Sequence, residues 1–401
     1  MAEGAHTVLI KVFISIFLAY FIISYSNNVY GGGFDNTGLG LQGMCMGNAL
    51  TAIVDDSSSV YYNPAGLTLI PKDSWSAELY SSITPSNFQF SDNGITDKSH
   101  ELFIVPGIFL ARRYDKSAFG LGLYIPYAGG GTAYDNFQHT DLDLESFAAW
   151  FALTPAFAYR LGEKVALGIG VSLYYGQIEN ENLYFPGATP CVLPMKSKYD
   201  GIAGYGGHIG LMYKPYSKVR FGLTARSQIP IKMDGWVKTA GVRKDSEVEM
   251  TFPSSFDFGL GYFPNQKITI GLSCSYRLWG HMDEIDFKTE HIQNSEKTYY
   301  NNSWLTGIGI DYKIDSKYAL KGGFKYIEGA TKEKGIHPSS NDLDFLASVI
   351  GIGCKITKSI ELNIAFMYVY GFEESYGSKK YDEDQPSLIF GFRYISNHLL
   401  E

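Results

Sequence analysis

The residues of this sequence that could carry out chemistry are scattered rather than gathered into a catalytic pattern. Gly38, Gly40 and Gly43 match the G-x-G-x-x-G pattern of nucleotide-binding loops, but no strand precedes them and no βαβ unit surrounds them. Neither His208 nor His281 has a partner at metal-ligand spacing, and the four cysteines lie far apart with no C-x-x-C pair. We therefore interpret the glycine pattern as flexible chain, and we expect no catalytic residue, no metal site and no cofactor.

The composition favours a β protein and excludes several other classes. The 401 residues carry 33 Lys and Arg against 41 Asp and Glu, giving a net charge of −8 and a pI near 5.6, so nucleic acid is not an expected partner. Aromatic residues make up 15% of the chain, too many for an acidic disordered protein. The mean hydropathy of −0.08 is too polar for a bundle of membrane helices, whereas 30 Tyr, 26 Phe and 44 Gly suit strands with close backbone contacts.

A long apolar run begins the chain at residues 8–23, and only Lys11 and Ser15 interrupt it. Its uninterrupted part is shorter than the about 20 residues that a membrane-spanning helix needs. A short apolar run that follows a positive residue and precedes small residues is typical of a signal peptide. We therefore expect residues 1–31 to be the signal peptide of an exported protein, with a permanent N-terminal anchor as the alternative.

Apolar residues alternate with small or polar residues along much of the remaining chain. In residues 165–174, Val, Leu or Ile occupies every second position, and Ala, Gly, Ser or Tyr occupies the positions between. Residues 219–224, 360–370 and 388–394 follow a similar rule. A two-residue period indicates strands with one apolar face. Such strands would form either a soluble sandwich, which buries that face between two sheets, or a membrane barrel, which turns it toward lipid.

The lengths of the connections decide between these two folds. Short joins alternate with long polar ones, as in outer-membrane barrels with short periplasmic turns and long extracellular loops. The long joins are expected at residues 83–99, 128–146, 180–202, 230–253, 278–302, 328–344 and 371–385. Strands are expected near residues 73–82, 100–113, 117–127, 147–161, 165–178, 203–214, 218–229, 254–263, 267–277, 303–313, 318–327, 345–356, 359–370 and 386–395. The prediction is an all-β fold: a transmembrane antiparallel β-barrel of about 14 strands over residues 73–401, with residues 32–72 as a small N-terminal hatch inside the lumen.

The segment before the first expected strand carries a specific pattern. Residues 33–34, Gly-Phe, are followed by a stretch of small residues at 38–52 and by DDSSSVYYNPAGL at 55–67. This segment resembles the hatch signature of the FadL/toluene-X family of outer-membrane transporters of hydrophobic compounds, which ends in Asn-Pro-Ala. The similarity continues through residues 153–177 and 204–235, so most of the chain is covered.

The resemblance implies a hatch-closed barrel in the outer membrane that passes long-chain fatty acids or aromatic hydrocarbons without an energy source. In this family the ligand binds at an outer loop site and then in an internal pocket, and a kink in the third strand opens a hole in the wall. The implied partners are the hydrophobic ligand, outer-membrane lipid and lipopolysaccharide, and the implied state is a monomer. A general porin and a structural or adhesive surface barrel are the competing hypotheses.

The resemblance also assigns roles to individual residues. Phe34 would contact the internal pocket, with a flexible periplasmic tail as the alternative. Asn63, Pro64 and Ala65 would form a rigid hatch or gating turn, because Asn caps turns through its side chain and Pro fixes φ.

The third expected strand contains Gly122 and Pro126, and Gly129 follows it. A proline inside a closed barrel removes a ladder hydrogen bond and is typical of a bulge or interruption. These residues are therefore candidates for the lateral opening; alternatively, Pro126 simply ends the strand at the membrane surface.

Two features bear on the ligand. In residues 135–147, Phe137, Leu142 and Phe147 would form a hydrophobic capture site on an amphipathic helical cover, or else lie on an ordinary surface loop. A fatty-acid carboxylate needs an internal cation, and alternation places six basic residues in the lumen, either lining a wet interior or pairing with acids such as Glu361 and Asp311. These six are Arg220, Arg226, Arg277, Lys321, Lys325 and Arg393. The fifth strand, where the family can place a basic contact, offers only Ser172, Tyr174 and Gly176, which favours a neutral hydrocarbon or another lipid.

Overall fold

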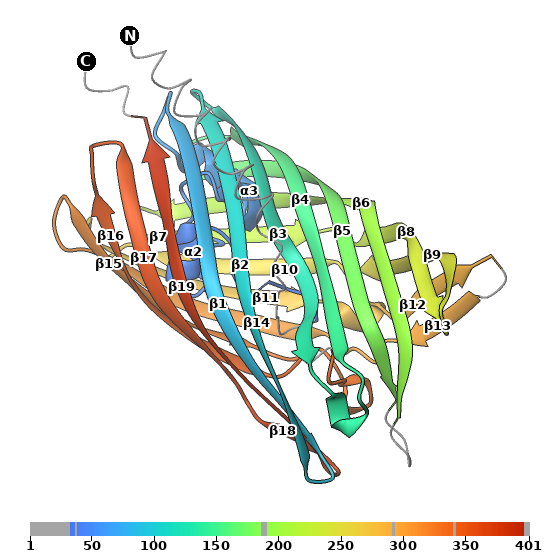
Figure 1. Ribbon diagram of the computed structural model, residues 1–401. Helices are drawn as coiled ribbons and strands as arrows, with labels where there is room; N and C mark the ends of the chain where they lie inside the picture. The colour runs from blue at the N-terminus through green and yellow to red at the C-terminus, as the bar shows by residue number, and fades with distance from the viewer. Residues whose placement is uncertain (1–32, 37, 186–190, 291–292, 340–341, 397–401) are drawn as a thin grey trace.

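The computed structural model describes residues 33–396 except 37, 186–190, 291–292 and 340–341, so the expected signal peptide lies outside the described residues. Within the described part, fourteen strands form a closed ring in which every neighbouring pair is antiparallel (Figure 1). The ring closes where β19 pairs with β1, from Ser76 opposite Ile395 to Ser91 opposite Lys380. The ring strands are β1 (Trp75–Asp92), β2 (Ile95–Arg113), β3 (Ser117–Tyr134), β4 (Leu144–Arg160), β5 (Val165–Phe185), β6 (Cys191–Tyr216), β7 (Val219–Arg226), β10 (Ser255–Tyr262), β11 (Ile268–Arg277), β14 (Ser303–Lys313), β15 (Tyr318–Ile327), β16 (Phe345–Lys355), β17 (Ile360–Gly371) and β19 (Lys379–Ile395). The predicted fold class is confirmed.

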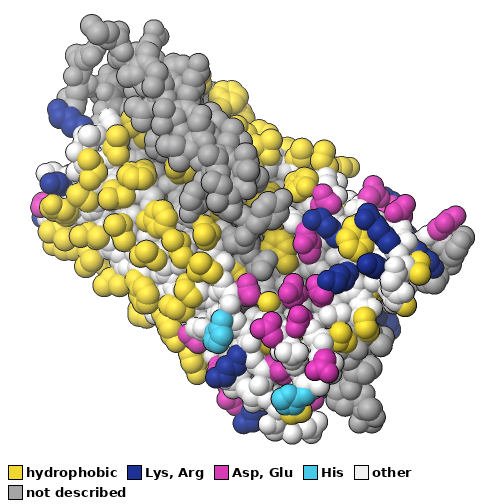
Figure 2. Space-filling model, in the orientation of Figure 1, with side chains coloured by type: hydrophobic (Ala, Val, Ile, Leu, Met, Phe, Trp, Pro, Cys, Tyr) yellow, Lys and Arg dark blue, Asp and Glu magenta, His cyan; other side chains and the backbone are white. Residues whose placement is uncertain are grey.

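The outward-facing residues of the ring are apolar, as the alternation predicted. In β5, Leu167 and Val171 are 46% and 53% exposed, whereas the neighbouring Ser172 points inward and is 3% exposed. Figure 2 shows hydrophobic side chains covering the end of the barrel nearer the chain termini and charged side chains gathered at the opposite end. The apolar zone faces lipid, where apolar side chains are stable and where exposing a polar side chain costs free energy.

Much of the chain predicted as long loops is strand. β1 and β2 stay paired up to the turn at Asn93 and Gly94, so the loop expected at residues 83–99 is wrong. The loop expected at 230–253 is a hairpin of two further strands. Among the described residues, five strands lie outside the ring: β8 (Ile229–Thr239), β9 (Val242–Phe252), β12 (Glu284–Thr289), β13 (Gln293–Lys297) and β18 (Glu374–Tyr376). Strand pairing continues beyond the apolar zone, where the outer face meets water, so no lipid-facing apolar residues mark these strands in the sequence.

Residues 38–70 form an inner segment that lies within the barrel (Figure 1). It contains α2 (Leu41–Cys45), α3 (Ser59–Tyr62) and the 3-10 helix η1 (Pro64–Leu69); further 3-10 turns in the connections are η2 (Phe137–His139), η3 (Trp279–His281) and η4 (Glu333–Gly335). A Cβ atom on Gly222, Gly271 or Gly307 would lie 2.0, 2.2 or 2.0 Å from a backbone oxygen of this segment. Inward-facing glycines are therefore required for the inner segment to fit. None of the described helices is long and apolar enough to cross a membrane.

Candidate functional site

The N-terminal strap, residues 33–36, lies along β3 where that strand is irregular. Two hydrogen bonds come from Asn36, whose backbone N–H donates to Pro126 O at 2.9 Å and whose side-chain amide donates to Ile125 O at 2.7 Å. The Ala128 N–H donates to Phe34 O at 2.8 Å. The ladder between β2 and β3 stops at Leu123, which leaves backbone groups on the β2 side of β3 to pair with the strap. The register between β3 and β4 also shifts near this point.

The barrel wall is interrupted at the same place. Paired residues of β2 and β3 begin near the short turn at residues 114–116 and stop at Ile108 opposite Leu123, just before Pro126. β3 itself continues in pairing with β4 up to Tyr134, so the interpretation that Pro126 ends the strand is wrong. Pro126 lies at an interruption of the ladder, as a proline without a backbone donor requires.

Phe34 is surrounded by aromatic side chains. Its ring centroid lies 5.5, 5.5, 5.8 and 6.4 Å from the rings of Trp150, Phe252, Trp279 and Tyr300, here called the aromatic cage. A Cβ atom on Gly129 would lie 2.5 Å from the Phe34 ring, so this glycine leaves room for the ring. Gly122 leaves room for a different side chain, because a Cβ atom on it would lie 2.8 Å from the ring of Phe109.

Asp35 belongs to a buried chain of charges. Its carboxylate accepts hydrogen bonds from Arg277 Nε at 3.1 Å and from the Trp279 indole N–H at 3.3 Å. Arg277 also donates to Asp257 at 3.1 Å, and Asp257 accepts from Arg226 Nε at 3.3 Å. The signs alternate, so each buried charge has a partner of opposite sign, which desolvated ions require. This chain joins the strap to β11, β10 and β7.

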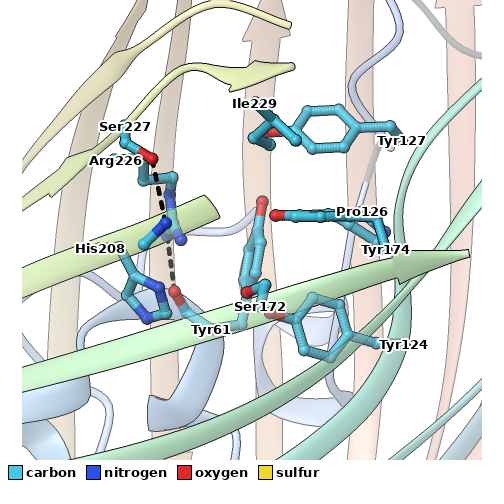
Figure 3. Close-up of a pocket in the computed structure, with 11 residues that line it drawn as sticks. Tyr61, Tyr124, Pro126, Tyr127, Ser172, Tyr174, His208, Arg226, Ser227 and Ile229 are labelled. Atoms are coloured by element: carbon cyan, nitrogen blue, oxygen red, sulfur yellow. Dashed lines mark hydrogen bonds between the residues drawn. The ribbon is translucent and has the colours of Figure 1, made fainter. Parts of the chain in front are cut away.

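Two pockets that share Tyr61 and Arg226 lie beside these charges. The first is next to the interruption in β3, and Figure 3 shows its lining side chains, with Arg226 donating to Tyr61 O at 2.5 Å. The second pocket is lined by Asn36, Arg277 and Lys325, among others. Lys325 is 3% exposed, and its ammonium nitrogen has no hydrogen-bond partner in the part of the chain that the structure describes.

Of the other basic residues predicted in the lumen, Arg393 and Arg220 bind the inner segment, and Lys321 pairs with acids of the barrel wall. Arg393 pairs with Asp56 at 3.3 Å and with Glu361 at 2.7 Å, and Lys321 pairs with Glu361 at 3.1 Å. Arg220 donates to a backbone oxygen of the inner segment at 3.4 Å. For these residues, the expected pairing with lumenal acids and backbone outweighs a role in ligand binding.

Asn63, Pro64 and Ala65 lie at the start of η1. Asn63 Oδ1 accepts from the Ala65 N–H at 3.2 Å, and Asn63 Nδ2 donates to Thr51 O at 2.9 Å and to Leu211 O at 3.0 Å. Pro64 is the first residue of η1, where its missing N–H leaves no helical hydrogen bond unmade. The motif therefore caps η1 and joins the inner segment to β6, and its gating role stays a prediction.

The three residues predicted for an outer capture site do not share one surface. Phe137 is buried in η2, with its ring stacked on that of a β1 phenylalanine at 5.6 Å, and Leu142 packs against the same cluster. Phe147 lies on β4 in a separate cluster with Ile125. The expected helical cover is wrong, because a 3-10 turn is followed at Leu144 by β4. A ligand role for these residues stays a prediction.

Sequence reasoning missed Asp35, Asp257 and Trp279. Asp257 lies on β10 between two outward-facing phenylalanines. The alternation that placed Arg226 and Arg277 inside would therefore have placed Asp257 beside them. Asp35 and Trp279 lie outside alternating strands, and only their contacts in the fold reveal them.

Comparison with known proteins gives a family match. A family model described as "Outer membrane protein transport protein (OMPP1/FadL/TodX)" matches residues 26–392. An outer membrane protein P1 of Haemophilus influenzae is 20% identical over 328 residues, covering 71% of this chain and 71% of that protein. A long-chain fatty acid transport protein of Escherichia coli is 20% identical over 400 residues, covering 86% and 89%.

Solved structures share the fold. A Pseudomonas aeruginosa FadL homologue superposes with a TM-score of 0.76 at 16% identity, covering 90% of this chain and 99% of that one. The Pseudomonas putida toluene transporter TodX gives a TM-score of 0.72 at 18% identity, covering 91% and 100%.

Proposed function

The chain belongs to the OMPP1/FadL/TodX family of outer-membrane transport proteins, and on that premise we propose that it passes hydrophobic molecules passively across the outer membrane. The ligands are long-chain fatty acids or related lipids and hydrocarbons, the classes named in the relatives' descriptions. The route runs through the pockets beside the strap and leaves through the wall at Pro126 or past the inner segment. Transport makes and breaks no covalent bond.

One observation carries this proposal: the strap that fills the aromatic cage is hydrogen-bonded to the interrupted part of the wall. Phe34 occupies the cage, and Asn36 bonds to the backbone at Pro126. A ligand that enters the cage must displace Phe34 and so disturbs these hydrogen bonds. Occupation of the pocket would therefore shift the strap away from the wall.

We assign the hatch to residues 32–72, between a signal peptide at 1–31 and the barrel at 73–401. The inner segment supports this division, because its contacts with inward-facing glycines and its buried ion pairs fill the lumen. A general porin would instead need an open aqueous lumen. We further propose that the barrel acts as a monomer among outer-membrane lipid and lipopolysaccharide; the ring of described strands closes within one chain, so no second copy is needed to complete it.

The test is uptake of labelled oleate and labelled toluene by cells that express this chain and lack their own transporter. Heat-modifiable gel mobility verifies barrel insertion in the same cells. Uptake of either compound above an empty-vector control is the expected result. A correctly inserted barrel that takes up neither would support the structural or adhesive alternative, and uptake of small hydrophilic solutes alone would support a porin.

A further inference from the structure

The strap presents two chemical groups to the barrel on consecutive residues: the benzyl ring of Phe34 and the carboxylate of Asp35. Each group enters a built site, the ring in the aromatic cage and the carboxylate against Arg277 and Trp279. We propose that the transported ligand is an aromatic carboxylate, an aryl ring joined to a carboxylate by an aliphatic linker, and that Phe34 and Asp35 hold its place when the site is empty. This inference rests on the proposed transport function and narrows its substrate class.

The ring site is specific for an aromatic group. Trp150 meets the Phe34 ring edge-on, at an interplanar angle of 78°, while Phe252 and Trp279 meet it at 31° and 52°. Edge-to-face and tilted pairs gain from ring quadrupoles in addition to buried area. An alkyl chain of equal size would gain only the buried area, so the cage favours an aryl ring over a fatty-acid tail.

The carboxylate site is specific for an anion. Asp35 is 3% exposed, and its Oδ2 accepts both the Arg277 and the Trp279 hydrogen bond. When the strap leaves, a neutral hydrocarbon would leave the Arg277 guanidinium with one acceptor fewer in a buried place. Removing one partner of a buried charge is costly, and a ligand carboxylate restores that partner.

The surrounding charges add to this preference. Arg226 and Arg277 pair with Asp35 and Asp257, so two guanidinium groups meet two carboxylates. Without Asp35, two guanidinium groups would meet one carboxylate. Lys325 supplies a buried donor with no partner among the described side chains, in the same pocket as Arg277. A fatty acid would satisfy these cations and an alkylbenzene would satisfy the cage, whereas an aromatic acid satisfies both.

The experiment measures equilibrium binding of three matched probes to the full barrel in lipid nanodiscs, with empty nanodiscs as the blank. The probes are 6-phenylhexanoate, 6-cyclohexylhexanoate, which has a saturated ring, and hexylbenzene, which has no carboxylate. We expect 6-phenylhexanoate to bind about tenfold more tightly than either of the others after partition into lipid is subtracted. Equal affinity for the two acids would overturn the ring site, and equal affinity for 6-phenylhexanoate and hexylbenzene would overturn the carboxylate site.

Two variants test the place-holding role. Asp35→Asn keeps the shape of the strap but removes its charge, so the ligand no longer competes with an internal carboxylate. Both 6-phenylhexanoate and hexylbenzene should then bind about tenfold more tightly, because each displaces the strap, and the ratio of their affinities should stay unchanged. Lys325→Met should lower the same ratio. An unchanged affinity of Asp35→Asn for 6-phenylhexanoate would mean that Asp35 does not hold the place of the ligand carboxylate, which contradicts the proposal.

Cell uptake separates this inference from the proposed function. Uptake of oleate or toluene without a preference for 6-phenylhexanoate would overturn the aromatic-acid assignment and leave the transport function standing. A correctly inserted barrel that takes up none of these compounds would overturn both.

Discussion

The inner segment and the strap are neighbours in the chain, yet the barrel holds them by different means. The inner segment is held by closed sets of partners: Asp56, Glu361, Lys321 and Arg393 are paired with one another, and Asn63 joins η1 to β6. The strap is held by a few backbone hydrogen bonds, one ring and one carboxylate. We therefore expect the inner segment to stay in place and the strap to move, because segments with few contacts unfold locally before the rest of a protein.

The largest expected effect comes from breaking the inner set of charges. Arg393→Met leaves the fully buried Asp56 without its cation, although Lys321 still pairs with Glu361. Loss of one partner from a buried ion pair costs about 3–5 kcal/mol, so the urea midpoint of the reconstituted barrel should fall, and ion conductance in planar bilayers should appear. Arg393→Lys is the matched control, because it keeps the charge. A closed barrel of unchanged stability in Arg393→Met would contradict the assignment of stability to the inner segment.

A smaller effect is expected from filling the space that glycine leaves. A Cβ atom on Gly307 would lie 2.0 Å from Gly47 O, whereas one on Gly162 would meet nothing within 4 Å. Gly307→Ala should therefore cost about 1–3 kcal/mol through overpacking, and Gly162→Ala should leave the urea midpoint nearly unchanged. Similar midpoints for the two variants would mean that the inner segment adapts to the wall and is less rigid than we infer.

The wall interruption gives a third test, on transport rather than stability. Pro126→Val restores a backbone N–H at the kink. β3 could then extend its pairing with β2 into the stretch that now pairs with the strap. We expect uptake to fall about fivefold, equivalent to about 1 kcal/mol in the barrier, while insertion stays normal. Pro155→Val on β4 is the control, because that proline lies on the outward face away from the strap. Normal uptake by a well-inserted Pro126→Val barrel would separate the kink from transport.

The barrel could be predicted from the sequence because the surrounding lipid requires apolar side chains on its outer face. Each ring strand must turn an apolar face outward, so a two-residue period and an even number of strands could be recognised. The strands beyond the apolar zone were missed because water on their outer face removes the need for apolar residues there. Pairing nevertheless continues in this part of the barrel, where Phe90 of β1, for example, faces the interior.

The site was only partly predictable for a related reason. Phe34 was identified through the family resemblance, and Arg226, Arg277 and Lys325 through alternation. Their grouping was not predictable, because Asp35 and Arg277 are separated by 242 positions and meet only when the barrel closes. No local pattern shows which of the six inward basic residues has no partner among the described side chains, since that depends on where the inner segment supplies acids.

The smallest expected effect tests whether the strap is held by ring chemistry or by buried area alone. Phe34→Leu keeps an apolar side chain but removes the quadrupole that the aromatic cage contacts. We expect the Asn36 amide, which donates to Pro126 O, to exchange with solvent about threefold faster, because the strap opens more often. The Ala65 amide in the inner segment, which donates to Asn63 Oδ1, should exchange at an unchanged rate. Faster exchange at both amides would mean that strap and inner segment open together, and the contrast between them would have no mechanical basis.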